Sequence, residues 1–299
     1  MDVSIVIVNY NTLKVTQQCI NSVFEKTSDV SFEVILVDNS SNDGSKEIFE
    51  ADNRIIYIYL DYNAGFGRAN NIGLTKATGE YILFLNSDTV LLNNAIKIMH
   101  DIFLTKKKNK IGALGCMLSD INGKFVHSYG RFFTMSDVII NTIKAYFKNP
   151  FKKNMHVPQG VSAKEDFFRV DYVTGADMMV PMSIIRKLGA FDSAFFMYCE
   201  DCYMQYVYTQ QGFSSYISVK PHIIHLESVS TKNNAYNLKK KILIERSRFI
   251  YLKKIYTPIQ YKLFRFFYFI LRSPFIIKPG VSFYEKKEYF HMLLSPVKI

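Results

Sequence analysis

The residues best suited to bind a metal or a phosphate follow a buried apolar run. Residues 82–85 (Ile-Leu-Phe-Leu) are typical of a buried strand, and Asn86, Ser87 and Asp88 come directly after it. In an open parallel α/β sheet, ligands gather outside the carboxyl ends of the strands. A carboxylate at such a position can hold a cation against a phosphate, so Asp88 is a candidate metal ligand. The alternative is that these three residues only form a turn, where Asn, Ser and Asp are common.

The segments around this strand end alternate between apolar runs and amphipathic helices. Apolar runs predict strands at 3–8, 32–37, 55–60, 80–86, 111–118, 170–173, 178–180, 214–219 and 223–225. Helical spacing predicts helices between them, including 182–188 and 200–210 and one that turns Ala95, Ile96, Met99 and Phe103 inward. This alternation indicates an α/β fold with a mixed, mostly parallel central sheet. Residues 119–169 are less periodic, and no element is predicted there.

Two motifs that would point to other functions are incomplete. Residues 65–70 hold two of the three glycines of a dinucleotide-binding fingerprint, but Asn70 stands at the third position. Residues 38–49 begin with the spacing of a calcium loop, but Asp43 stands where that loop needs glycine for its sharp turn. The sequence therefore favours neither a nicotinamide-dependent dehydrogenase nor a calcium-binding loop.

Composition indicates the kind of compartment in which this chain of 299 residues folds. Apolar residues make up 48% of it, which is enough for a substantial core, and its four cysteines are too few for a disulfide scaffold. We therefore expect a reducing compartment. The amino terminus lacks a basic region and is predicted to be a strand, not a signal peptide. No run of eighteen uncharged apolar residues occurs, so no simple transmembrane helix is expected.

The net positive charge of the chain is confined to its last fifth. Residues 238–299 contain 14 Lys and Arg against 3 Asp and Glu, so the whole formal charge of +11 lies there. Within this region Lys262, Arg265 and Arg272 fall on one arc of a predicted aromatic-rich helix, a pattern suited to an anionic membrane interface. The alternative is a core-packing helix with a solvated basic edge. No nucleic-acid partner is expected, because no recognised binding motif accompanies the patch.

Several motifs in a fixed order resemble one enzyme family. They are residues 4–11 (SIVIVNYN), 37–45 (VDNSSNDGS), 63–71 (NAGFGRANN) and 85–88 (LNSD), followed by 174–180 (TGADMMV), 189–192 (GAFD) and 195–201 (FFMYCED). Over about residues 3–250 the chain resembles family 2 glycosyltransferases of GT-A fold. The last three motifs resemble its rhamnosyltransferase-like branch.

The resemblance implies inverting transfer of a sugar, with rhamnose as the candidate, from a dTDP- or UDP-sugar donor. It also implies a divalent cation, Mn²⁺ or Mg²⁺, and a glycan or lipid-linked acceptor. Asp201 would be the general base, Asp88 a metal ligand and His225 a further ligand, with His222 as a nearby rival. Donor-binding residues implied by the resemblance are Asn9, Tyr10, Asp38, Asn63, Gly65, Arg68, Asn71 and Ser87, and acceptor-side residues are Glu200, Gly175 and Ala176.

General chemistry agrees with these assignments. Sugar transfer needs a carboxylate to take the proton of the attacking hydroxyl, and a cation to neutralise the departing diphosphate. Simpler alternatives are that Asp201 only caps a helix and that Asp38 only makes an Asx-turn. The chain also departs from the family at three positions: Asn86 replaces the first carboxylate of Asp-x-Asp, Pro181 replaces a basic residue, and Cys199 replaces glycine.

These observations predict the organisation of the protein. We expect a GT-A catalytic domain at 1–237, with a donor-binding half at 1–118 and an acceptor and catalytic half at 170–227, and a basic helical extension at 238–299. The protein would act in the cytoplasm, at the inner face of the cell membrane, in cell-surface polysaccharide biosynthesis. The alternative function is a non-catalytic protein that binds nucleotide sugars or glycans, which only Asn86 supports.

Overall fold

A computed structural model describes residues 1–146, 165–226, 238–274 and 282–295. The chain forms two compact units. Among the described residues, the first unit consists of 1–131, 165–196 and 200–226, and the second of 132–146, 197–199, 238–274 and 282–295. The predicted boundary between 237 and 238 falls where residues 227–237, which lie outside the described residues, meet the first residue of the described stretch 238–274.

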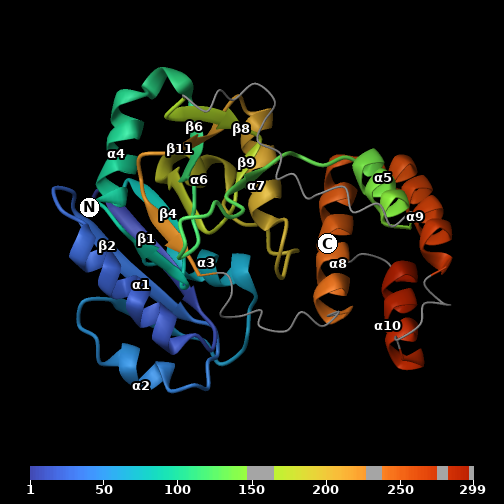
Figure 1. Ribbon diagram of the computed structural model, residues 1–299, viewed down its shortest axis with the longest axis horizontal. Coiled ribbons are helices and arrows are strands. Elements are labelled where there is room, and N and C mark those ends of the chain that lie inside the picture. The colour runs from blue at the N-terminus through green and yellow to red at the C-terminus, as the bar shows by residue number, and fades with distance from the viewer. Residues whose placement is uncertain (147–164, 227–237, 275–281, 296–299) are drawn as a thin grey trace. The chain divides into compact units, whose positions relative to one another are not determined.

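The first unit is built on a mixed eight-stranded sheet (Figure 1). Its strands, in spatial order, are β3 (Ile56–Tyr59), β2 (Phe32–Asp38), β1 (Val3–Asn9), β4 (Tyr81–Asn86), β10 (Asp177–Pro181), β6 (Ile111–Cys116), β11 (Ser214–Ser218) and β8 (Phe167–Val170). The first four strands are parallel, and β10 runs antiparallel to both β4 and β6. Two short ladders pair β5 (Thr89–Leu91) with β12 (Ile223–His225) and β7 (Tyr129–Gly130) with β9 (Tyr172–Val173). The predicted mixed, mostly parallel sheet is confirmed.

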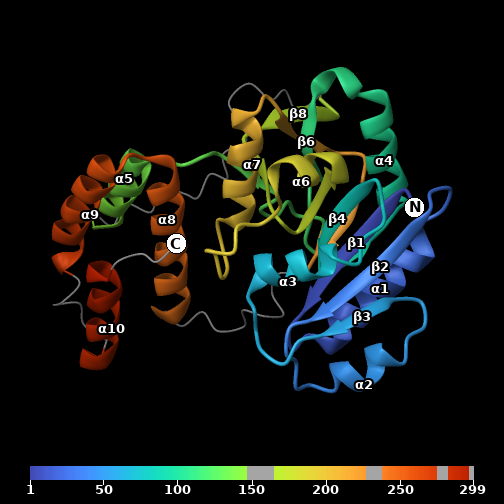
Figure 2. The same ribbon diagram turned by 180° about the vertical axis from the view of Figure 1, so that it is seen from behind.

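Helices cover both faces of this sheet, as the opposite views in Figures 1 and 2 show. One face packs against α1 (Leu13–Lys26), α2 (Ser45–Glu50) and α4 (Ala95–Thr105), and the other against α3 (Phe66–Leu74), α6 (Met182–Leu188) and α7 (Glu200–Gln210). Alternate residues of a strand belong to opposite layers: Ile5 and Ile7 pack into the first core, and Val6 into the second. A strand buried on both faces needs a continuous apolar run, which is what the sequence shows.

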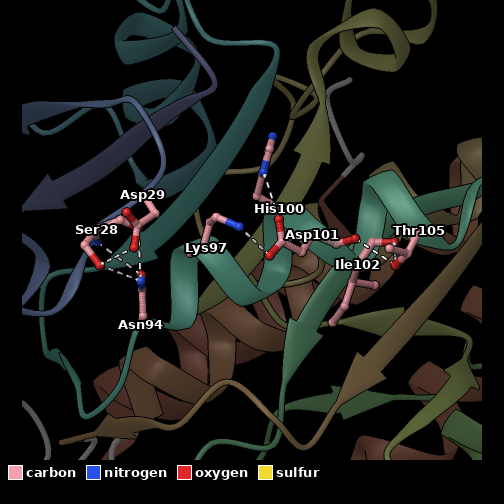
Figure 3. A network of polar contacts seen from close by, with 8 residues as sticks. All are labelled: Ser28, Asp29, Asn94, Lys97, His100, Asp101, Ile102 and Thr105. Carbon is pink, nitrogen blue, oxygen red and sulfur yellow. Dashed lines mark hydrogen bonds and ion pairs between the residues drawn. The ribbon is translucent and has the colours of Figure 1, made fainter.

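Helix α4 illustrates how local sequence fixes an element. Its four predicted inward residues, Ala95, Ile96, Met99 and Phe103, are all buried, which confirms the predicted face. Figure 3 shows the polar side of the same region, where the Asn94 amide donates to the carbonyl and hydroxyl of Ser28. Lys97 and Asp101 pair one helical turn apart at 2.5 Å. These contacts are exposed, so apolar burial provides most of the stability of α4.

The second unit is helical. Its helices are α5 (Met135–Tyr146), α8 (Leu238–Ile255), α9 (Pro258–Arg272) and α10 (Phe283–Leu294). Helix α5 lies beside α9 although the two are far apart in the sequence (Figures 1 and 2). The prediction of helices in the extension is confirmed for the described residues, whereas α5 falls in the stretch where no element was predicted. None of the helices in the described part of the chain is both long and apolar enough to cross a bilayer.

A buried polar triad joins three helices of this unit. Arg272 of α9 donates to Glu245 of α8 at 2.7 Å and to the Tyr289 hydroxyl of α10 at 2.5 Å. The Tyr289 hydroxyl in turn donates to the other Glu245 oxygen at 2.7 Å. All three side chains are buried, and the carboxylate raises the pKa of the Arg272 guanidinium despite burial. The triad therefore fixes how α8, α9 and α10 pack together.

The predicted basic stripe on α9 is wrong. Arg272 is buried in the triad, and Arg265 lies over the Phe249 ring and donates to the carbonyl oxygens of Leu293 and Ser295. A sequence pattern shows which residues share an arc but not which arc faces the core. Here the buried Glu245 pairs with Arg272, and Arg265 packs on Phe249 and binds the end of α10, so apolar residues of α9 are left exposed.

We expect Arg272→Met to destabilise the second unit by about 3–5 kcal/mol, because the buried Glu245 loses its close cationic partner and keeps only the Tyr289 hydroxyl and the more distant Lys241, at 3.9 Å. Replacing Glu245 as well, in Glu245→Leu with Arg272→Met, should recover part of the loss, because no charge then remains unpaired. Denaturant unfolding of the full chain measures both effects, and Arg246→Met, at an exposed position of α8, is the matched control. Equal unfolding midpoints for Arg272→Met and Arg246→Met would contradict the structural importance of the triad.

Candidate active site

The turn after β4 brings Asp88 and His225 together. The ladder between β5 and β12 pairs His225 with Thr89, so the histidine lies beside the strand end although the two are distant in sequence. The Nε2 atom of His225 lies 3.1 Å from Asp88 Oδ1 and 3.3 Å from the Asn86 amide nitrogen. His222 is exposed and points its backbone N–H at Asn93 instead. The structure therefore places His225, and not its rival His222, beside Asp88.

The chemistry of this pair suits a divalent cation with help from a ligand. A carboxylate oxygen and an imidazole nitrogen are both ligands of Mn²⁺, and Mg²⁺ often takes one or two carboxylates plus substrate phosphates. Among the described residues, no three His, Cys, Asp or Glu side chains gather closely enough to hold a metal by themselves. Asp88 and His225 therefore fit a cation that completes its coordination with diphosphate oxygens and water.

Asp201 lies in the first turn of α7 and is held by two backbone donors. Its Oδ2 atom accepts from the N–H of Gly175 at 2.9 Å, and Oδ1 accepts from the N–H of Cys202 at 2.7 Å. Burial raises the pKa of Asp201 above its ordinary value of 3.8, and these two donors and the charge of His127 only partly offset the rise. A carboxylate with a raised pKa is a better proton acceptor than an exposed one. Asp201 also lies at the amino-terminal end of α7 and accepts from a backbone N–H there. The position predicted for the base is therefore also the one predicted for a helix cap.

Two consecutive acceptor-side residues join Asp201 to the strand end. The N–H of Gly175 binds Asp201, and the carbonyl oxygen of the next residue, Ala176, accepts from the N–H of Asn86 at 2.9 Å. The antiparallel register continues this connection, since Asp177 pairs with Leu85. The structure thus brings the predicted base and the predicted metal ligands to one edge of the sheet. Glu200, the remaining acceptor-side candidate, is buried, and its side chain packs near Gly67 of α3.

Gln205 positions this edge of the site and was not predicted. Its side chain is fully buried and pairs with the backbone of Val173 in both directions, at 2.8 Å and 2.7 Å. It also accepts from the Ser215 hydroxyl at 2.8 Å. Gln205 lies one helical turn after Asp201, so it fixes the helix that carries the predicted base. A glutamine between apolar positions in a predicted helix was the only signal available in the sequence.

A second buried carboxylate lies below the strand end. Asp177 accepts from the N–H of Cys116 at 2.6 Å through Oδ2, while Oδ1 is buried without a hydrogen-bond partner. Burial raises the pKa of Asp177 to about 7, although Cys116 and the charge of His225 oppose the shift. The site therefore contains a carboxyl group that is mostly protonated below neutral pH.

Asp38 and Asn9, two predicted donor-binding residues, are fully buried. Asp38 accepts from the N–H of Ser41 at 2.8 Å and from the Tyr57 hydroxyl at 3.0 Å. Asn9 donates to the Ser41 hydroxyl at 3.0 Å and accepts from the hydroxyls of two threonines in α1 and its N-terminal flank. Both side chains hold the loops after β1 and β2 in place, and direct nucleotide contact by them stays a prediction.

The loop before α3 needs its glycine for a close approach to protein rather than to a ligand. Gly65 has φ +85°, and a Cβ atom there would lie 2.2 Å from the Phe196 carbonyl oxygen. That oxygen accepts from the N–H of Phe66 at 2.8 Å. Asn63 accepts from the N–H of Gly65 at 2.9 Å and from the amide of Asn39. Close packing, not open space for a donor, therefore explains the conformation of this loop.

Four other donor-binding candidates lie around these loops. Asn71 pairs its amide with the backbone of Phe191, at 2.6 Å and 3.2 Å, and so ties α3 to the loop at 189–192. Arg68 is exposed and donates through Nε to the carbonyl of Ser193. Tyr10 is 48% exposed, which leaves it accessible to a ligand. Ser87 lies in the turn after β4, with its hydroxyl 3.2 Å from that of Thr12.

The replacement of glycine by Cys199 has a structural consequence. Cys199 has φ +65°, and Tyr198 before it has φ +73°. This left-handed region costs an L-residue roughly 1–2 kcal/mol, whereas glycine adopts it readily. The chain therefore keeps the backbone conformation that a glycine would favour, just before the helix that carries Asp201.

Comparison with solved structures shows the fold. The crystal structure of residues 1–349 of Staphylococcus aureus TarS, in complex with UDP, matches with a TM-score of 0.55 and 17% identity, over 98% of this chain and 79% of that one. The fold is the GT-A fold of nucleotide-sugar transferases, as predicted.

The family follows from sequence. The model of the family described as "Glycosyl transferase family 2" matches residues 4–158, and the chain belongs to this family. The glycosyltransferase GlyG of Streptococcus pneumoniae is 34% identical over 33% of this chain and 34% of its own length. The rhamnosyltransferase WbbL of Escherichia coli is 28% identical over 58% of this chain and 64% of its own length. The chain thus covers less than two thirds of either relative.

The raised pKa of Asp177 predicts a pH-dependent stability. The folded state retains a proton that the unfolded state loses near pH 4, so the contribution of Asp177 is complete below that pH and is lost as the pH rises through about 7. As the pH rises across this window, the free energy of unfolding of wild type should fall relative to that of Asp177→Asn by up to ~1.4 kcal/mol per pH unit. Denaturant unfolding at several pH values measures the difference. Asp61→Asn, on an exposed loop, should show no such slope, and a constant difference for Asp177→Asn would refute the prediction.

Proposed function

We propose that this family 2 protein is an inverting, metal-dependent glycosyltransferase. The observation that carries the proposal is the connection through Gly175 and Ala176, which joins Asp201 to the strand end where Asp88 meets His225. A base and a candidate cation site at one sheet edge are the two requirements of transfer from a nucleotide sugar.

In the proposed reaction, Asp201 takes the proton of an acceptor hydroxyl as its oxygen attacks the anomeric carbon of the donor. The bond from that carbon to the diphosphate oxygen breaks, and the diphosphate leaves with the electron pair. The N–H groups of Gly175 and Cys202 fix the carboxylate so that one lone pair can meet the acceptor. Because the acceptor oxygen attacks the face of the sugar opposite the departing diphosphate in a single displacement, the anomeric configuration is inverted.

Asp88 and His225 would hold the divalent cation, Mn²⁺ or Mg²⁺. When bound, the cation neutralises charge on the diphosphate. The imidazole must present the lone pair of Nε2, so its proton must lie on Nδ1 in the metal-binding form. Asn86 contributes an amide beside His225 and no charge, so the imidazole has a larger part here than beside two carboxylates.

The donor and acceptor are proposed from similarity. The name of WbbL makes rhamnose, carried by dTDP, one candidate, and the UDP bound to TarS makes a UDP-sugar the other. The acceptor would be a glycan or a lipid-linked glycan in cell-surface polysaccharide biosynthesis. Such an acceptor, and the charge of +11 in residues 238–299, support action in the cytoplasm at the inner face of the cell membrane.

We expect Asp201→Asn to lower transfer by about 100- to 10,000-fold, because the amide cannot accept the proton. Nucleotide binding should stay intact, since the asparagine oxygen still accepts from one of the two backbone donors and the side chain keeps nearly the same size. Turnover with a panel of UDP- and dTDP-sugars, a lipid-linked acceptor and Mn²⁺ measures the first effect, and calorimetric titration with UDP and dTDP the second. Asp171→Asn, at an exposed position, is the control. Full activity in Asp201→Asn would reject the base assignment, and nucleotide binding without turnover in wild type would favour the non-catalytic alternative.

His225→Ala should raise the Mn²⁺ concentration needed for half-maximal transfer by at least about tenfold, because one of two protein ligands is lost. Excess Mn²⁺ should restore part of the rate, since Asp88 remains. Metal titrations of transfer measure the shift. His222→Ala is the matched control, because that histidine is nearby in sequence but exposed. The same metal requirement in both variants would exclude His225 as a ligand.

A further inference from the structure

The outward face of α9 is an apolar stripe. Ile259, Leu263, Phe266, Phe267 and Ile270 are each between 51% and 73% exposed. At about 100° per residue they share an arc of about 100°, on the opposite side of the helix from Arg265 and Arg272. Two of the five are phenylalanines, and exposing such a surface to water is unfavourable. An apolar patch of this kind marks a binding surface.

A hollow with a different character opens beside this stripe. It encloses about 480 Å³ between the end of α8, helix α9 and the end of α10. Its cationic lining consists of Lys253, Lys262 and Arg265, and none of the described residues that line it carries a carboxylate. Phe269 and Leu294 form part of its apolar wall, and Phe266 belongs both to the wall and to the stripe.

Arg265 is fixed in place at this hollow. Its guanidinium lies 4.4 Å from the centre of the Phe249 ring, donates to the Tyr261 hydroxyl at 3.0 Å and binds the carbonyl oxygens that end α10. These partners are neutral, so the positive charge of Arg265 is not cancelled. Within the described residues, neither Arg265 nor the exposed Lys262 has a carboxylate partner. The hollow therefore combines a preorganised positive charge with an apolar entrance.

We propose that the hollow binds the phosphate headgroup of an anionic membrane lipid, while the stripe of α9 lies among the acyl chains. The inference rests on the membrane association within the proposed function and assigns it to particular residues. Cations within an apolar wall match a molecule that carries a phosphate and a hydrocarbon chain together. A free phosphate would leave the stripe uncovered. Nucleic acid offers no apolar surface to cover five exposed apolar side chains.

The test is flotation of the full-length protein with vesicles of phosphatidylcholine, with and without phosphatidylglycerol. Lys253→Gln with Lys262→Gln should lower partitioning into the anionic vesicles by roughly 30-fold, because two cations near the headgroups are removed. Lys286→Gln with Lys287→Gln removes the same charge from the start of α10 and should lower it by less than about threefold. Phe266→Ser with Phe267→Ser should lower binding to both kinds of vesicle.

Equal losses of partitioning in the two double-lysine variants would overturn the headgroup site, because general charge attraction would then explain the binding. A wild-type protein that transfers sugar but floats with neither vesicle would reject this inference and leave the proposed function standing. A protein that floats as expected but transfers no sugar would instead reject the proposed function. If the wild type is a dimer that Phe266→Ser with Phe267→Ser converts to a monomer, a second copy covers the stripe and the lipid assignment is wrong.

Discussion

The antiparallel pairing of β10 with β4 is the constraint on which the site depends. Four parallel strands bring their carboxyl ends to one edge, but a parallel neighbour next to β4 would leave its entry loop at the far edge. Because β10 runs the other way, its entry loop reaches the end of β4, where Ala176 binds Asn86 and Gly175 binds Asp201. One reversal of strand direction thus brings Asp201 of α7, the proposed base, to the sheet edge that holds Asp88 and His225, the proposed metal ligands.

Around this edge, buried polar groups give rigidity rather than net stability. Gln205 satisfies both backbone groups of Val173, and a fully paired network of this kind fixes a single geometry. Asp177 is different, since one of its oxygens has no partner and its pKa rises to about 7. The second unit follows the same principle, where one buried glutamate orients Arg272 and so decides which face of α9 meets water.

The sequence predicted most of the fold and the composition of the site, but not its contacts. Strands and helices of the first unit follow from apolar runs, because strands buried on both faces tolerate little else. The family resemblance named Asp88, His225 and Asp201 as candidates, and their roles stay predictions. Helix α5 was missed because it packs against α9, a partner distant in sequence. The orientation of Arg265 and Arg272 was mispredicted because helical periodicity does not reveal a buried partner such as Glu245 on another helix. Gln205 gave only a weak signal, a glutamine between apolar positions of a predicted helix, since its importance lies in its contacts.

The most direct test of the account is the anomeric configuration of the product. The claim is that one carboxylate, Asp201, serves as base on the acceptor side of a single displacement. NMR of the glycan formed from whichever UDP- or dTDP-sugar supports turnover measures the coupling at the new anomeric centre. The account predicts a configuration opposite to that of the donor. Retention of the donor configuration would contradict it, because a retained linkage needs a different reaction course from a single attack assisted by Asp201.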